Sequence, residues 1–116
     1  MSESTPVNIQ AFQPFEGGLG VQISVTGTTA NAMLPGTQAV QNPDKLRILV
    51  TNDGETTVSI RMGQQGVQAT VHCQRVMPGT QVLLTPPVVA PSGVWLAAIS
   101  PSGDSTTIQA TAGYGT

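Results

Sequence analysis

The residues that most often carry chemistry are few in this chain, and the only histidine stands next to the only cysteine. His72 and Cys73 lie in the run 67–74, in which apolar and polar residues alternate. Because successive side chains of a strand point to opposite faces, these two cannot easily act together. We expect His72 to be exposed and Cys73 to lie in the core. A single histidine cannot form a multi-histidine metal site, so we expect no metal and no cofactor.

The carboxylates do not form a catalytic pattern either. Asp53, Glu55 and Asp104 fall in predicted turns, where aspartate fills local hydrogen-bonding roles. Glycoside hydrolysis needs two carboxylates that face one groove, and the spacing gives no such pair. The stretch 16–20, EGGLG, superficially resembles a phosphate-binding loop, but no predicted helix follows to hold an anion. We therefore expect no catalytic residue and no enzyme activity.

Four aromatic side chains are candidates for binding: Phe12, Phe15, Trp95 and Tyr114. The two phenylalanines lie in residues 1–18, which contain two prolines and the hinge-like pair Gly17 and Gly18. This composition predicts an extended N-terminal arm. Burial of a phenylalanine contributes about 1.5–3 kcal/mol, so we expect the arm to dock, either on this domain or on a neighbouring molecule.

The strongest local pattern is the stretch 45–63, where two alternating apolar runs flank Asn52-Asp53-Gly54. This pattern predicts a β-hairpin with a three-residue loop and Gly54 in the left-handed conformation. The expected register sets Val50 opposite Thr56, Ile48 opposite Val58 and Leu46 opposite Ile60. It also sets Lys45 opposite Arg61, a like-charge pair that an acidic group from elsewhere would neutralise.

The same period of two recurs along the rest of the chain. Alternating runs predict strands at 19–26, 30–34, 37–41, 67–74, 81–85, 94–100 and 106–112. Both faces of the run 94–100 are apolar enough to be covered, and residues 101–104 are expected to make a last hairpin turn. About eight strands at a spacing of 8–12 residues predict an all-β, single-domain β-sandwich that is jelly-roll-like. We place the arm at 1–18 and the sandwich at 19–116.

Composition sets further bounds on function. The chain has 116 residues and only 9% charged residues, against about 25% in ordinary soluble domains. A nearly uncharged surface gives little repulsion between copies, which suits dense packing in an assembly. Four basic residues and a net charge of −2 argue against direct nucleic-acid binding. No signal peptide or membrane-spanning run is visible, and one cysteine allows no internal disulfide.

The succession VNIQAFQPF, VQISVTGTTANAMLPG, LRILVTNDGETTVSIRMG, VMPGTQVLLTPP and VWLAAISPSGDSTTIQATAGYG resembles small capsid decoration (cement) proteins of tailed bacteriophages. Some members of that group have a jelly-roll β-fold. The resemblance implies a virion structural protein that is made in the host cytoplasm and binds the capsid exterior. There a homodimer or homotrimer would bind the major capsid protein and cement neighbouring subunits against the pressure of packaged DNA.

Two alternatives stay open: a phage tail or head–tail connector component, and a lectin-like ligand-binding module. In the lectin-like alternative, Trp95 and Tyr114 would form the platform on which a sugar stacks. Across these hypotheses the candidate partner-binding residues are Phe12, Phe15, Lys45, Arg61, Trp95 and Tyr114. We expect no membrane partner.

Overall fold

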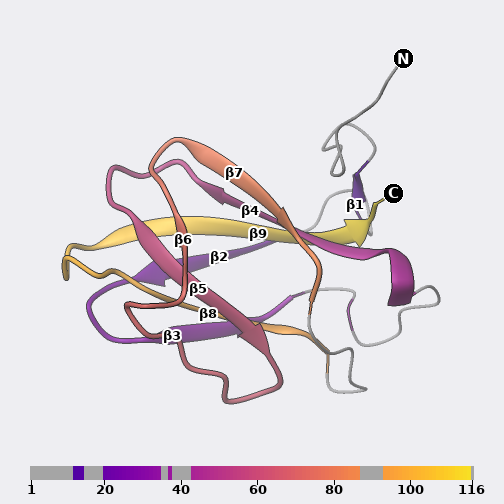
Figure 1. Ribbon diagram of the computed structural model, residues 1–116, viewed down its shortest axis with the longest axis horizontal. Coiled ribbons are helices and arrows are strands. Elements are labelled where there is room, and N and C mark those ends of the chain that lie inside the picture. Colours follow the sequence, from indigo (N-terminus) through magenta and orange to yellow (C-terminus); the bar gives the residue numbers. More distant parts are fainter. Residues whose placement is uncertain (1–11, 15–19, 35–36, 38–42, 87–92, 116) are drawn as a thin grey trace.

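The computed structural model describes residues 12–14, 20–34, 37, 43–86 and 93–115, and these form two packed antiparallel sheets (Figure 1). The prediction of an all-β sandwich is confirmed. A 3₁₀ turn, η4 (Pro43–Lys45), precedes β4. The strands are β1 (Gln13–Pro14), β2 (Gly20–Val25), β3 (Ala30–Met33), β4 (Leu46–Asn52), β5 (Val58–Gly63), β6 (Gln74–Val76), β7 (Thr80–Leu84), β8 (Trp95–Ile99) and β9 (Thr106–Tyr114).

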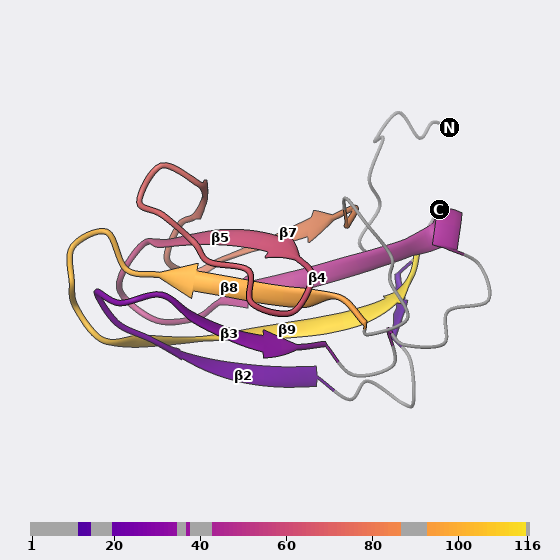
Figure 2. The same cartoon turned by 90° about the horizontal axis from the view of Figure 1, so that it is seen from below.

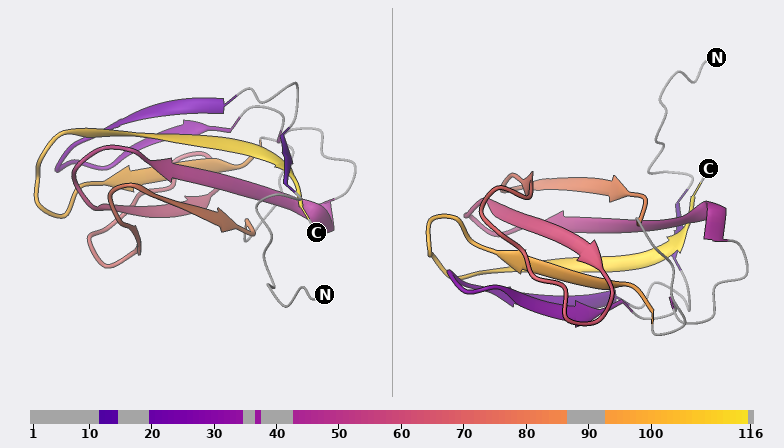
Figure 3. Two further views of the ribbon diagram at one scale, coloured as in Figure 1. Left: turned by 90° about the horizontal axis from the view of Figure 1, so that it is seen from above. Right: turned by 60° about the horizontal axis from the view of Figure 1, so that its bottom comes forward.

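The strand order is that of a jelly roll. The first sheet, sheet A, has the order β2-β9-β4-β7, with β1 also paired to β9; the second, sheet B, has the order β3-β8-β5-β6. Most connections therefore cross from one sheet to the other, which gives the two-layer form with two Greek keys. Figure 2 shows β4 and β9 in one layer and β5 and β8 in the other. The right-hand view of Figure 3 shows β7, β4 and β9 following one another across sheet A.

The core lies between the sheets and is built by alternation. In β4, Leu46, Ile48 and Val50 are fully buried, and the intervening residues are half-buried on the outer side. Sheet A adds inward side chains from β2 and β9, and sheet B adds them from β5 and β8; these include Ile23, Val25, Val58, Ile60, Leu96, Ala98, Ile108 and Ala110. Each fully buried Val, Leu or Ile contributes about 1.5–3 kcal/mol. The inward faces that alternation predicts for β2, β4, β5 and β9 are confirmed, whereas no inward face was predicted for β8.

The predicted central hairpin is wrong. Strand β4 pairs with β7 and β9, whereas β5 pairs with β6 and β8, so the two runs lie in different sheets. The expected register between them does not exist, and Lys45 does not face Arg61. The same error affects residues 101–104, which connect β8 in sheet B to β9 in sheet A. They do form a turn, in which the Gly103 N–H donates to the Ser100 carbonyl at 3.0 Å, but not a hairpin.

Asn52 explains why the chain crosses between sheets at this point. Its fully buried side-chain amide donates to the Thr56 carbonyl and to the Val76 carbonyl, both at 2.9 Å. Its side-chain oxygen accepts from the Gly54 N–H at 3.1 Å, and its backbone carbonyl accepts from Gly79 at 2.6 Å. One side chain thus supplies the backbone with partners that a hairpin ladder would otherwise provide.

Gly54 is required for space rather than for a left-handed conformation. The described glycines with positive φ are Gly66, Gly79, Gly93 and Gly103, and Gly54 is not one of them. A Cβ at Gly54 would instead collide with the hydroxyl of Thr106 at the start of β9. The prediction of the glycine's conformation was wrong because close packing against a distant strand, not turn geometry, selects this residue.

The predicted strand at 67–74 is also wrong over most of its length. Only Gln74 of that run belongs to a strand, and residues 64–73 form a loop, the covering loop, over the outer face of sheet B. Side chains of β3, β5 and the connection before β3 hold its backbone: Asn31 donates to the Val67 carbonyl, Ser59 to the Val71 carbonyl, and Thr29 accepts from the Ala69 N–H. Ser59 and Ala97 beneath it are fully buried. Cys73 is therefore partly exposed on a loop rather than in the core, while His72 is exposed as expected.

Part of the predicted arm is a strand of sheet A. Gln13 and Pro14 pair with Tyr114 and Gly113 at the end of β9, and β2 pairs with residues 106–111 of the same strand. Residues 15–19 connect β1 to β2. On β9, the partners of these two strands are separated by Ala112 alone. A Cβ at Gly113 would collide with the Gln13 carbonyl, so glycine allows β1 to approach. Phe15 and residues 38–41 of the predicted strand at 37–41 lie outside the described residues, and Thr37, which is described, is not in a strand.

Candidate functional site

Three of the six predicted partner-binding residues come together around the end of β9. Tyr114 is half-buried and pairs with Gln13 of β1 on one side and Leu46 of β4 on the other. Phe12, which is half-buried, directly precedes β1. Lys45 is exposed, and its backbone carbonyl accepts a hydrogen bond of 2.8 Å from Gly115. This end of sheet A therefore combines the N-terminal segment with the C-terminal strand.

Arg61 and Trp95 form a separate group on the outer side of sheet B. Trp95 begins β8, pairs with Gly63, and is half-buried, while Arg61 in β5 is exposed opposite Ala97. Within the part of the chain that the structure describes, the buried indole N–H of Trp95 has no hydrogen-bond partner. Trp95 and Tyr114 belong to strands of different sheets, so no single strand face presents both rings.

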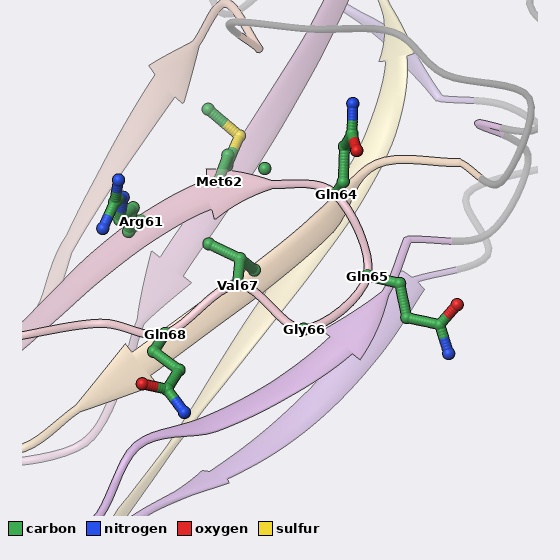
Figure 4. A pocket seen from close by; sticks show the side chains of 8 residues that line it. Arg61, Met62, Gln64, Gln65, Gly66, Val67 and Gln68 are labelled. Atoms are coloured by element: carbon green, nitrogen blue, oxygen red, sulfur yellow. The ribbon is translucent and has the colours of Figure 1, made fainter.

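A hollow of about 470 Å³ lies along the covering loop, between Arg61 and Gln68. Figure 4 shows that the side chains of Gln64, Gln65 and Gln68 point in different directions, away from the loop, while Arg61 lies apart from them. Ligand sites usually place a few polar groups so that they converge on one point. The polar groups labelled here do not converge, so this hollow does not have the arrangement of a small-molecule site.

At this surface the thiol of Cys73 contacts Thr70. The Thr70 hydroxyl lies 3.4 Å from the sulfur, and the Thr70 backbone N–H donates to it at 3.3 Å. Hydrogen bonding from the Thr70 side chain first, then from its backbone, and finally the positive charge of Arg61 outweigh burial. Together they hold the pKa of the Cys73 thiol below its ordinary value.

Replacement of Thr70 by valine is expected to raise the pKa of Cys73, because it removes the side-chain hydrogen bond and keeps the backbone one. The thiolate is the reactive form, so the variant should be alkylated more slowly than the native protein near pH 7. The measurement is the rate of iodoacetamide modification across pH. In urea the two proteins should react alike, and coincident profiles for the folded proteins would contradict the role of Thr70.

The surface that the sequence did not single out is the outer face of sheet A. Its outward residues form rows across four strands, one of which is Gln22, Gln109, Thr51 and Gln81 in register. The next row is Gly20, Thr111, Leu49 and Leu83. Among the outward residues of β2, β4, β7 and β9, Arg47 carries the only charge, and its guanidinium donates back to the carbonyls of Asp44 and Leu46.

The two outer faces of the sandwich thus differ. The covering loop lies on sheet B, while Gln22, Gln81 and Gln109 on sheet A are exposed. Alternation predicts polar outward residues on both sheets, so it cannot tell which outer face a loop covers. The contacts of Asn31 and Ser59 with residues distant in the sequence make that distinction. We take the outer face of sheet A as the candidate binding surface, and call it the glutamine face.

Within the described residues, no group of three or more His, Cys, Asp or Glu side chains is placed to hold a metal ion. The same residues include no helix of the length and hydrophobicity needed to cross a membrane. Comparison of the chain with protein-family models, curated proteins and solved structures finds no match. Function is therefore inferred from the residues and surfaces of the chain itself.

Proposed function

We propose that this protein is a non-enzymatic virion structural protein that binds the outside of an icosahedral phage capsid and cements neighbouring major capsid protein subunits. The observation that carries the proposal is a jelly roll in which Arg47 is the only charged outward residue of β2, β4, β7 and β9. Jelly rolls occur in viral capsid domains and also in lectins and cupins, so the fold alone does not decide the function. The sequence resemblance to phage decoration proteins favours the first of these.

Most of the described charged side chains lie away from the glutamine face, and the exposed Arg61 and Arg75 belong to β5 and β6 of sheet B. Asp44, Lys45 and Arg47 lie together where η4 leads into β4, while Asp53, Glu55 and Asp104 lie in the connections that follow β4 and β8. A surface rich in hydroxyl and amide groups binds a partner through hydrogen bonds, because these groups both donate and accept. Such attachment is weakly sensitive to salt, since screening acts on charges.

Cementing requires each copy to hold more than one shell subunit. When one molecule bridges two sites, the second contact is intramolecular, and modest affinities combine into strong attachment. A rigid sandwich suits this task, because its binding groups are held by packed strands and do not have to be ordered on binding. Many copies would then share the outward load from packaged DNA.

The test is to add the purified protein to empty, expanded phage heads that lack it, and to count bound copies at saturation. We expect saturable binding at hundreds of copies per head, together with a rise in the temperature at which the heads open. In a parallel arm, a chain lacking residues 1–18 should stay folded but bind heads more weakly, since the segment ending in β1 is then missing. Truncated protein that saturates heads at the native concentration would exclude a role for the arm.

The same experiment separates the alternative assembly role. A tail or head–tail connector component would bind at a single ring position, giving few copies per particle, and would not stabilise heads throughout. The lectin-like module would be favoured by two results together. The protein would not bind heads, and it would bind on a glycan array in a way that Trp95→Ala or Tyr114→Ala abolishes. Each result therefore points to one class.

A further inference from the structure

We propose that two copies of this chain pair through their glutamine faces, related by a twofold axis that runs along the strands between β4 and β9. Pairing covers the glutamine face, so a paired protein would attach to a capsid through its other surfaces, such as the end of β9 where Phe12, Lys45 and Tyr114 lie. The pairing follows from the shape and chemistry of the face itself, which is complementary to its own copy.

The first element of complementarity is shape. The row Gly20, Thr111, Leu49, Leu83 ends in a glycine on β2 and in a leucine on β7. Beside Gly20 the surface has a hollow of about 260 Å³, bordered by Gln22, Gln109 and Thr111. At the other end of the row, Leu49 and Leu83 are only half-buried on the outer side.

Rotation by 180° about an axis between β4 and β9 places the row of one copy over the same row of the other copy, in reverse order. The order of strands is then inverted in the second copy, so β2 of one copy faces β7 of the other. Leu83 of each copy is thereby placed over the Gly20 hollow of its partner, and Leu49 over Thr111. Such an interface is isologous, so a single match between a leucine and a hollow stabilises the pair at two places.

The second element is hydrogen bonding. The same operation places Gln22 opposite the partner's Gln81 and Gln109 opposite the partner's Thr51. Amide and hydroxyl groups donate as well as accept, so a row of them can satisfy its own copy, which a row of lysines or of glutamates could not do. Gln81 already donates to Thr51 at 3.1 Å within one chain, which holds part of this row in place.

The third element is the absence of like-charge repulsion on the face. Arg47 is the only charged outward residue of these four strands, and its hydrogen bonds to two backbone carbonyls hold it at the margin. The face thus has apolar side chains in one row and uncharged polar groups in the next. An apolar patch that is depleted of charge and bordered by polar groups is typical of protein interfaces.

The oligomeric state of the full-length chain in solution tests the proposal. Sedimentation velocity should give a species of about twice the 11.9 kDa chain mass. Gln109→Lys and Gln109→Glu should each give monomers, because they set like charges against each other near the axis. A mixture of the two variants should restore the dimer. Gln68→Lys, a change of the same kind on the covering loop, should leave pairing intact.

Several outcomes would overturn the proposal. These are a native protein that stays monomeric up to its solubility limit, a Gln109→Lys variant that still dimerises, or a Gln68→Lys variant that dissociates equally. Gln109 is exposed, so both of its variants are expected to keep the native circular dichroism spectrum and a cooperative unfolding transition, which shows that lost pairing is not lost folding. Their melting temperature should lack only the concentration-dependent contribution of pairing.

Cysteine crosslinking tests the axis itself. In a Cys73→Ser background, Gln22→Cys and Gln81→Cys lie three strands apart in one chain, about 14 Å, which is too far for an internal disulfide. Sheets packed face to face lie about 10 Å apart, also beyond the reach of a disulfide, so a short bismaleimide is used as the crosslinker. The double variant should then form a covalent dimer, whereas each single variant should not. Equal crosslinking by the single variants would exclude this axis.

Discussion

Replacement of Asn52 by aspartate is expected to lower the free energy of unfolding by about 3–5 kcal/mol at neutral pH. The native amide donates to the carbonyls of Thr56 and Val76 at 2.9 Å, and the side chain is fully buried. In the variant a carboxylate oxygen would face both carbonyl oxygens, with no donor between them. Urea denaturation followed by circular dichroism measures the loss.

The matched control is Asn31→Asp, the same chemical change at an exposed position. Asn31 donates one hydrogen bond of 3.0 Å to the Val67 carbonyl, and water can replace that donor when it is lost. We expect a cost below about 1 kcal/mol there. Comparable losses for the two variants would show that Asn52 does not hold the crossing between the sheets.

The Asn52→Asp variant should also depend on pH in a defined direction. Burial and the two facing carbonyls disfavour the charged form, so the pKa of the new carboxyl should be raised in the folded state. A group with a raised folded pKa is least destabilising below its unfolded pKa, and its cost grows as pH rises toward the folded pKa. The difference from the native protein should therefore be smaller at pH 4 than at pH 7.

The same residue marks the limit of what the sequence could predict. Alternation in the stretch 45–63 predicted correctly which side chains face inward, because burial on one side of a strand imposes a period of two. The partner of each strand was predicted wrongly. Asn52-Asp53-Gly54 satisfies a hairpin turn and a sheet-crossing connection equally well, and the carbonyl of Val76 that decides between them lies 24 residues away.

The covering loop was missed for a related reason. Residues 67–74 alternate as a strand does, but their apolar members are small, and Val71 is 36% exposed. What holds this segment is a set of side chains from β3, β5 and the connection before β3, including Asn31 and Ser59. No local pattern reports such contacts. Consequently the sequence also could not tell which sheet keeps an open face, and the glutamine face was not among the predicted site residues.

Replacement of Leu96 by alanine is expected to cost about 2–5 kcal/mol, because it leaves a cavity between the sheets. Leu96 is fully buried and belongs to the core cluster, facing inward from β8. The control is Ile99→Ala in the same strand, which removes an isomeric side chain that is half-buried on the outer side. A loss of about 1 kcal/mol is expected there, in proportion to the smaller area buried.

The comparison of these two variants decides which face of β8 carries the fold. The sequence shows apolar residues on both faces of this strand, and either face is a plausible core. The structure places the packed interior on the side of Leu96 and Ala98, and among the described residues the other side is covered by the loop that contacts Ser59 and Asn31. Loop contacts can open locally, whereas the interior cannot relax without separating the sheets. Equal costs for Leu96→Ala and Ile99→Ala would mean that the covering loop packs as firmly as the second sheet, contrary to the two-layer arrangement.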